Sequence, residues 1–243
     1  MTMLDMSLMI GSLGELAGGL WLTLRLFVTI LAVGIVLGIP VAVLHASTSR
    51  PAHAMAATYI LLFRGTPSLV QLYLVYYGLG QFEAVRASVL WPVLREPFWC
   101  AVIALGLNSA AYTGRLMSGA LNAIPRGLID ATKALALPAR ATFFRIKLPL
   151  VVQLALPAYA NEVILTLKAT SLASTITLMD LTGTARLLVS QTYAPYEIFM
   201  TAGLIYLVMT LALTRLFRSL ERRVNALTGA ADRDSVLAEP ARA

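Results

Sequence analysis

The chain of 243 residues is 58% hydrophobic and only 13% charged, against about 45–50% and about 25% in an ordinary soluble domain. This composition, with a mean hydropathy of +0.78, excludes a conventional soluble protein. The net charge of +7 does not indicate nucleic-acid binding, because the basic residues flank apolar segments and do not form one face with base-reading groups.

The apolar residues are collected into runs that carry at most one charge each. Each run is close to the about 20 residues that cross a hydrocarbon layer about 30 Å thick. Five such runs follow one another along the chain, at residues 20–44, 54–79, 98–114, 148–167 and 198–214. The sequence therefore predicts an all-α membrane protein with five transmembrane helices.

Basic residues predict the orientation of these five spans. The stretch around Arg50, the long loop 115–147 and the tail from residue 215 hold 13 of the 19 Lys and Arg residues. Basic loops stay on the cytoplasmic side of a membrane. The N-terminus is therefore expected outside and the C-terminus in the cytoplasm.

The first three spans contain local signals of packing. Gly34 and Gly38 form a pair of small residues that allows another helix to approach closely, although such pairs also occur by chance in apolar segments. Gly65 and Pro67 interrupt the second span. Cys100 lies inside an apolar run, which predicts a buried, inert thiol without a disulfide.

The loop 115–147 contains two short stretches that favour helix, residues 127–136 and 139–147, separated by Pro138. Together they mix Arg and Lys with Leu, Ile, Phe and Ala. This composition suits helices under anionic lipid head groups, and it equally suits a docking element for another protein. The loop composition alone leaves both alternatives open.

Residues 169–179, after the fourth span, are uncharged, rich in Ser and Thr, and too short to cross the membrane. We expect a re-entrant or interfacial segment there. Irregular backbone at membrane depth is tolerated only against protein or a wet cavity. The segment thus indicates a solute pathway.

Ionisable side chains inside the spans need a partner or a function, because it costs free energy to place them in the bilayer. Arg25 is near enough to a span end to snorkel outward, and Arg64 is interpreted as a structural cation. Glu162 either meets a cationic solute group or pairs with Lys168 or Arg64. Asn108 is placed to form an interhelical hydrogen bond or to line a solute pathway.

The sequence contains no nucleophile elbow, no metal-ligand spacing and no phosphate-binding loop of the GxxxxGK[ST] type. The chain is therefore not expected to be an enzyme or to hold a cofactor. If it pumps a solute, a partner must supply the energy.

The long loop resembles the coupling motif of permease subunits in bacterial ABC importers, which is written E-A-A, three residues, G, nine residues, I-x-L-P. The spacing is retained, whereas Asp130, Thr132 and Ala136 replace the Glu, Ala and Gly of the motif. Pro138 is expected to supply the helix break that the glycine would permit. The matching positions are Asp130, Ala131, Ala136, Ile146, Leu148 and Pro149.

Further stretches resemble the polar amino-acid permeases within this group. FRGTP at 63–67, VQ at 70–71 and YYG at 76–78 are similar to one signature, and NEVIL at 161–165, Lys168 and TSLA at 170–173 to another. Residues 96–101 and 107–113 resemble the M-type permeases of arginine, histidine and opine importers. Residues 78–82 and 174–179 are most similar to the arginine type.

This resemblance implies a type I ABC importer permease in the bacterial inner membrane. Its implied partners are a second permease subunit, most simply of the Q type, two ATP-binding subunits that hold ATP and magnesium, and a periplasmic solute-binding protein. The chain then divides into a periplasmic segment 1–19, a transmembrane domain 20–223 with the coupling loop 115–147, and a disordered cytoplasmic tail 224–243.

The resemblance implies a polar, basic amino acid as solute, with arginine first and histidine, lysine, ornithine or an opine as alternatives. A cationic group needs acceptors and a carboxylate needs donors. The predicted solute-binding residues are Glu162, Asn161, Asn108, Thr170 and Ser171. A channel or carrier that works without ATP is the alternative from another class, but it leaves the motif spacing unexplained.

Overall fold

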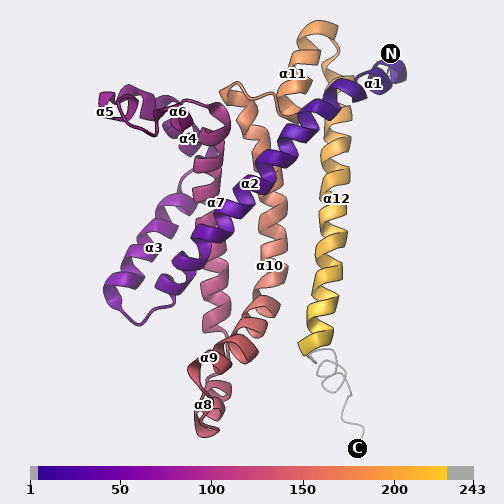
Figure 1. Ribbon diagram of the computed structural model, residues 1–243. Helices are drawn as coiled ribbons and strands as arrows, with labels where there is room; N and C mark the ends of the chain where they lie inside the picture. Colours follow the sequence, from indigo (N-terminus) through magenta and orange to yellow (C-terminus); the bar gives the residue numbers. More distant parts are fainter. Residues whose placement is uncertain (1–4, 229–243) are drawn as a thin grey trace, which may run out of the picture.

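The computed structural model describes residues 5–228, and Figure 1 shows them as an assembly of helices. The α-helices are α1 (Met6–Gly11), α2 (Leu13–His45), α3 (Arg50–Gly65), α4 (Ser68–Tyr73), α5 (Glu83–Arg86), α6 (Trp91–Leu94), α7 (Pro97–Asn122), α8 (Arg126–Ala134), α9 (Ala139–Thr142), α10 (Leu148–Ala169), α11 (Leu181–Thr192) and α12 (Pro195–Thr228). Between them lie the π-helices η1 (Leu74–Gly78) and η3 (Phe143–Lys147) and the 3-10 helices η2 (Leu79–Gln81) and η4 (Thr170–Ile176).

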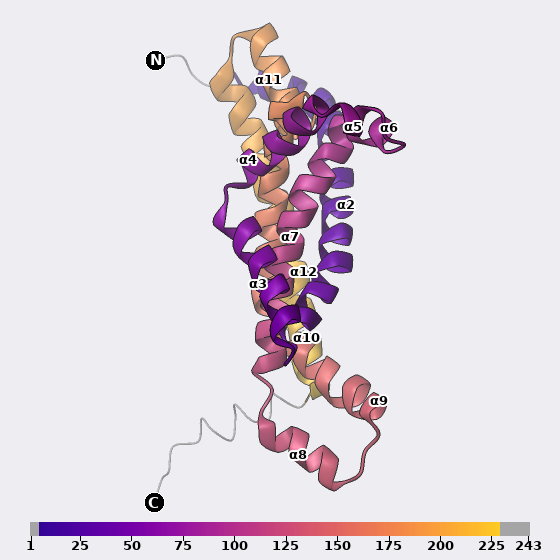
Figure 2. The same cartoon turned by 90° about the vertical axis from the view of Figure 1, so that its left-hand side faces the viewer.

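Helices α2, α7, α10 and α12 run along the height of the molecule (Figures 1 and 2). Helices α5, α6 and α11 lie at one end with α1, and α8 and α9 lie at the other with the last turn of α12. Among the described residues, three helical segments are long and apolar enough to cross a membrane: Leu13–His45, Ala139–Ile176 and Pro195–Ala226.

The second expected span is a broken helix. Helix α3 ends at Gly65, Thr66 adopts an extended conformation with φ −116° and ψ 146°, and α4 begins after Pro67. Proline has no N–H to continue the helix, and it disfavours helical geometry in the residue before it. The interruption that the sequence predicts at Gly65 and Pro67 is confirmed.

Helix α2 packs along α7 through glycines on both helices. A Cβ atom at Gly34 would lie 2.6 Å from Ser109 Oγ, and one at Gly38 would lie 2.8 Å from Thr113 Cβ. Gly106 on α7 leaves similar room for Val33. The absent side chains let the two backbones approach closely, so the predicted packing role of Gly34 and Gly38 is confirmed.

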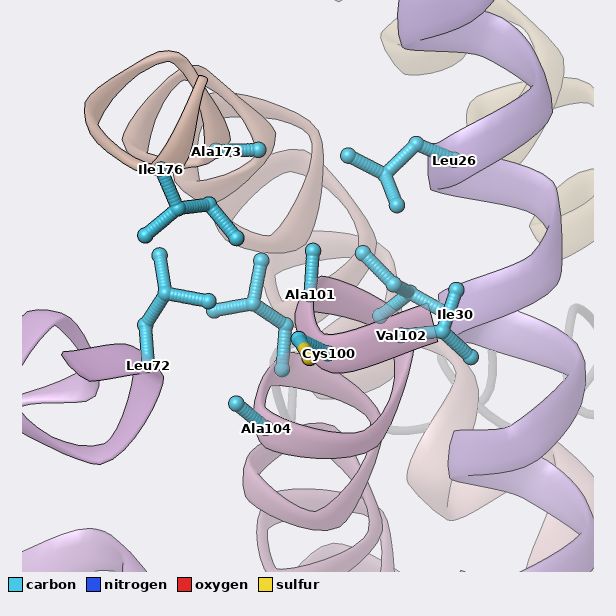
Figure 3. Close-up of a cluster of buried hydrophobic side chains, with 10 residues drawn as sticks. Leu26, Ile30, Leu72, Cys100, Ala101, Val102, Ala104, Ala173 and Ile176 are labelled. Carbon is cyan, nitrogen blue, oxygen red and sulfur yellow. The ribbon is translucent and has the colours of Figure 1, made fainter. Parts of the chain in front are cut away.

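One buried apolar cluster joins four segments at the upper end of α7 (Figure 3). Leu26 and Ile30 of α2 and Leu72 of α4 meet α7, and η4 closes the cluster with Ala173 and Ile176. Cys100 lies inside it and is a free, buried thiol, as the sequence predicts. This cluster fixes η4 against α4 and α7.

The first and last long helices extend beyond the apolar runs. The run begins at residue 20, but α2 begins at Leu13, because Leu16 is buried against α11 and α12 and supports an earlier helical turn. At the other end, α12 continues to Thr228, so residues 224–228 of the predicted tail are helical. The rest of that predicted tail, residues 229–243, lies outside the described residues.

The 169–179 segment continues α10 as the 3-10 helix η4 and then turns sharply. Thr177 has a φ of 70°, in the left-handed region. Asp180 then caps α11 by accepting hydrogen bonds from the N–H groups of Thr182 and Gly183, and the N–H of Leu181 donates to Thr23 Oγ1 of α2 at 2.9 Å. The turn is thereby tied to α2.

Helix α8 ends in a Schellman motif, and the break in the coupling loop lies at Ala136. Its φ is 49°, its N–H donates to Lys133 O at 2.9 Å, and the N–H of Leu137 donates to Thr132 O at 3.0 Å. The expectation that Pro138 supplies the break is wrong, because Pro138 instead precedes the first residue of α9. Ala136 occupies the position that favours glycine.

Candidate solute site and coupling loop

Glu162 is the central residue of the candidate solute site. Its side chain on α10 is only 6% exposed, and its Oε1 accepts a hydrogen bond from Thr166 Oγ1 at 3.3 Å. Within residues 5–228 the ion pairs are Arg95 with Glu96 and Lys133 with Asp130. Glu162 is therefore a buried carboxylate that no cation among residues 5–228 contacts in an ion pair, and such a group is costly unless a ligand compensates it.

A cavity of about 200 Å³ opens in front of this carboxylate, between α4, α7 and α10. It is lined by Ser68, Leu105, Asn108, Tyr112, Glu162, Leu165, Thr166 and Ala169. The lining combines one acid, polar side chains and aliphatic groups. That combination fits a small solute with a cationic group and an apolar stem.

Asn108 is held in place by the helix break of α3 and α4. Its Nδ2 donates to Phe63 O at 2.9 Å and to Gln71 Oε1 at 3.0 Å, and Gln71 Nε2 donates to Phe63 O at 2.8 Å and to Thr66 Oγ1 at 2.6 Å. These amide groups satisfy a carbonyl that the broken helix frees. Because both Nδ2 hydrogens are used, Asn108 has no donor left for a solute, and its Oδ1 is available as an acceptor.

Arg64 adds a cation beside the cavity. Its Cζ atom lies 4.8 Å from the centroid of the Tyr112 ring, and Tyr112 lines the cavity. Arg64 does not form an ion pair with Glu162 in the described part of the chain. A carboxylate thus lines the cavity and a guanidinium lies against one of its lining residues, and the two groups are opposite in charge to the ammonium and the carboxylate of an amino acid.

The structure brings together Glu162 and Asn108 but not the other predicted solute residues. Asn161 is exposed and does not line the cavity. Thr170 Oγ1 donates to Leu167 O and Ser171 Oγ to Lys168 O, each at 2.7 Å, so both hydroxyls bond to backbone at the start of η4.

Sequence reasoning missed Tyr112 and Thr166, which line the cavity. Each lies four residues after a predicted site residue, Asn108 and Glu162 respectively. Residues four apart share one face of a helix. Helical spacing is thus the signal that identifies them.

The predicted coupling residues lie at the end of the molecule that carries α8 and α9 (Figure 2). Asp130, Ala131 and Ala136 are exposed, Leu148 is also exposed, and Ile146 and Pro149 are half-buried where η3 passes into α10. Asp130 pairs with Lys133 at 2.9 Å on the surface, a contact that contributes little stability. The loop is therefore accessible to a partner, and η3 connects it directly to α10.

Long apolar helices around a cavity of mixed polar and apolar lining, with an exposed helical loop at one end, are the features of a membrane transport protein. The sequence pattern of the family described as "Binding-protein-dependent transport system inner membrane component" matches residues 34–226, and the chain belongs to this family. It is a multi-pass inner-membrane permease of an amino-acid ABC importer, which excludes the channel or carrier alternative.

Known proteins of similar sequence and structure are also parts of amino-acid or opine transport systems. The octopine transport system permease protein OccM of Rhizobium meliloti is 48% identical over 206 residues, covering 85% of this chain and 84% of that protein. The arginine ABC transporter permease protein ArtM of Escherichia coli K12 is 48% identical over 169 residues, covering 69% and 75%. A structure described as "Crystal structure of an amino acid ABC transporter with histidines" has a TM-score of 0.80 and 32% identity, covering 92% of this chain and 100% of that one.

Proposed function

We propose that the chain imports a cationic amino acid, with arginine first and histidine, lysine, ornithine or an opine as alternatives, and that Glu162 binds the cationic group. The observation that carries this proposal is the buried Glu162 carboxylate, which faces a cavity and has no ion-pair partner among residues 5–228. The names of the similar permeases, for octopine and arginine, support the same class of solute.

In this proposal the solute lies between α7 and α10. Its cationic group is bound by Glu162 and Asn108 Oδ1, and its carboxylate faces Arg64. Leu105 and Leu165 contact the apolar stem. Asn161, Thr170 and Ser171 stay candidate ligands for an arrangement in which η4 unwinds.

The proposed topology has five crossings: α2, the broken pair α3 and α4 with η1, α7, α10 with η4, and α12. The N-terminus is outside and the C-terminus is cytoplasmic. The placement of α1 and of the end of α12 at opposite ends of the molecule supports an odd number of crossings. The basic residues of the 115–147 loop support a cytoplasmic position for α8 and α9.

The proposed assembly contains a second permease of the Q type, two ATPase subunits with ATP and magnesium, and a periplasmic binding protein. Residues 130–149 couple the permease to an ATPase: closure of the ATPases moves α8, and η3 transmits the movement to α10, which carries Glu162. Such alternating access needs two conformations of similar free energy that ATP and the loaded binding protein bias.

Substitution of Glu162 with Gln tests the solute site. We expect arginine uptake by the reconstituted importer to fall by about tenfold or more at low solute concentration, because the Gln amide oxygen still accepts a hydrogen bond but lacks the negative charge that strengthens a bond to a cation. The measurement is initial uptake of labelled arginine in proteoliposomes, with lysine, histidine, ornithine and octopine as competitors.

Glu83→Gln is the matched control, since it removes the same charge from an exposed position on α5, outside the cavity. Co-purification of the other subunits checks assembly of both variants. Uptake with unchanged apparent affinity and maximal rate in Glu162→Gln would remove Glu162 from the solute site.

A further inference from the structure

A second cavity lies on the outer surface of the bundle, where α2 passes the first turn of α7. Its volume is about 420 Å³, and it is lined by Trp21, Leu24, Arg25, Val28, Thr29, Phe98 and Trp99. Figure 2 shows α2 at the periphery of the helix bundle at this level, away from α12. This groove is separate from the cavity at Glu162, with which it shares no lining residue.

Arg25 is the one charged residue of this lining, which is apolar or aromatic apart from Thr29, whose hydroxyl donates to Arg25 O at 2.7 Å. Its side chain is exposed, and its Cζ atom lies 5.8 Å from the centroid of the Phe98 ring. It takes part in neither of the two ion pairs found within residues 5–228; Glu96, next to the groove, pairs with Arg95 instead. An exposed guanidinium without a carboxylate partner favours an anionic ligand.

The position of Arg25 along α2 matches the head-group level of a membrane. From Arg25 to His45, the last residue of α2, the helix extends about 30 Å along its own axis at 1.5 Å per residue, and its inclination in Figure 1 makes the depth that it covers smaller than this, within the thickness of one hydrocarbon layer. Trp21 is 64% exposed and Trp99 43% exposed beside it. Exposed tryptophans concentrate at the membrane interface.

An exposed apolar stripe continues from the groove along α2. Val28, Ala32, Ile35, Ile39 and Val43 are all exposed and recur at spacings of three or four residues. This spacing places them on one face of the helix. The stripe offers an acyl chain a continuous path from the head-group level toward the other leaflet.

We propose that this groove binds an anionic phospholipid in the leaflet on the side of α5 and α6. The phosphate accepts hydrogen bonds from the Arg25 guanidinium, the two indoles flank the head group, and an acyl chain follows the stripe on α2. Because no carboxylate lines the groove, nothing there compensates the ammonium of a zwitterionic lipid. A lipid with net negative charge is therefore preferred.

The test uses the intact importer in vesicles that contain a photoactivatable phosphatidylglycerol or a photoactivatable phosphatidylcholine. We expect peptides with Trp21 to Thr29 and Phe98 to Trp99 to be labelled by phosphatidylglycerol about fivefold more than by phosphatidylcholine, the factor that one basic side chain contributes at an anionic surface. Equal labelling by both lipids in the native protein would overturn the proposal, and so would protection of these peptides from both by a neighbouring subunit.

Arg25→Gln should reduce the labelling ratio to near unity, whereas Arg25→Lys should keep most of it, since the phosphate needs a cation. Arg86→Gln is the matched control, because Arg86 is an exposed cation on α5 that does not line the groove. A ratio that stays high in Arg25→Gln, or that falls equally in Arg86→Gln, would overturn the assignment to Arg25.

Discussion

At the scale of single residues, the hydrogen-bond partners of a buried acid decide what it does. Glu162 and Asp180 are both buried acids, but their partners differ. Asp180 accepts from two backbone N–H groups at the start of α11, and the Tyr206 hydroxyl lies 3.4 Å from its Oδ2. The hydrogen bonds of Asp180 stabilise the start of α11. Glu162, in contrast, has one side-chain partner and faces a cavity.

Asp180 predicts a pH dependence of stability. Burial raises the pKa of Asp180 from 3.8 to about 6, although its backbone and Tyr206 hydrogen bonds act in the opposite direction. The folded protein thus holds this proton more tightly than the unfolded chain. The protonated Asp180 carboxyl therefore contributes to the free energy of unfolding. This contribution is present in full below about pH 4 and is lost as the pH rises through about 6.

The measurement compares thermal unfolding of the native protein and Asp180→Asn between pH 4 and pH 7. Asn still caps a helix but does not titrate in this range. We expect the Tm of the native protein to fall relative to the variant as the pH rises. Asp5→Asn is the control. Asp5 caps α1 on the surface, and the hydrogen bond from Ser7 lowers the pKa of Asp5. The stability that Asp5 contributes therefore increases with pH, in the opposite direction to that of Asp180. A parallel pH profile of the native protein and Asp180→Asn would contradict the prediction.

Residue types at given spacings predicted part of the site. Glu162 and Asn108 were found because polar groups at membrane depth need a function or a partner. Asn161 is adjacent to Glu162 in sequence, but neighbours on a helix point about 100° apart. Their different surroundings, one exposed and one buried, depend on packing against α7, which the sequence alone does not specify.

At the scale of elements, apolar runs locate the long helices but not their ends. The run from residue 20 underestimates α2, because the earlier turns are stabilised by contacts with α11 and α12 that are distant in sequence. The coupling loop shows the same limit. Its two helices were predicted, but the break was assigned to Pro138, whereas Ala136 itself adopts the left-handed conformation.

The contact between α2 and α7 gives a prediction at this scale. Gly38→Ala should destabilise the permease by about 1–3 kcal/mol, because its Cβ would lie 2.8 Å from Thr113 and force the helices apart. Gly18→Ala on the same helix has no atom within 4 Å of the added Cβ and should stabilise by about 0.5–1 kcal/mol through helix propensity. Thermal unfolding of the two variants in detergent checks the opposite signs. Equal shifts would show that the close approach does not limit packing.

At the scale of the whole molecule, the cavity at Glu162 and the 115–147 loop, for which solute binding and coupling are proposed, are joined by one continuous helical segment. Segment Ala139–Ile176 runs from α9 through η3 and α10 to η4, and it carries Glu162 on the way. Pro157 lies inside α10 between the loop and the cavity. A movement of the loop can therefore reach the solute site through one helix.

Ala136 tests this connection in the assembled importer. Ala136→Pro should uncouple transport from ATP hydrolysis, because proline fixes φ near −65° and has no N–H, whereas Ala136 has a φ of 49° and donates to Lys133 O. Ala136→Gly is the matched variant, since glycine adopts positive φ without strain and restores the residue of the family motif.

We expect stimulation of ATP hydrolysis by the loaded binding protein to disappear in Ala136→Pro and to persist in Ala136→Gly. Solute uptake should follow the same pattern. Thermal unfolding of both variants separates loss of coupling from loss of fold, because Ala136 is exposed and contributes to none of the buried apolar clusters of residues 5–228. If Ala136→Pro retained full stimulation and uptake, the end of α8 would not transmit the movement, and coupling would have to pass through η3 and Leu148 alone.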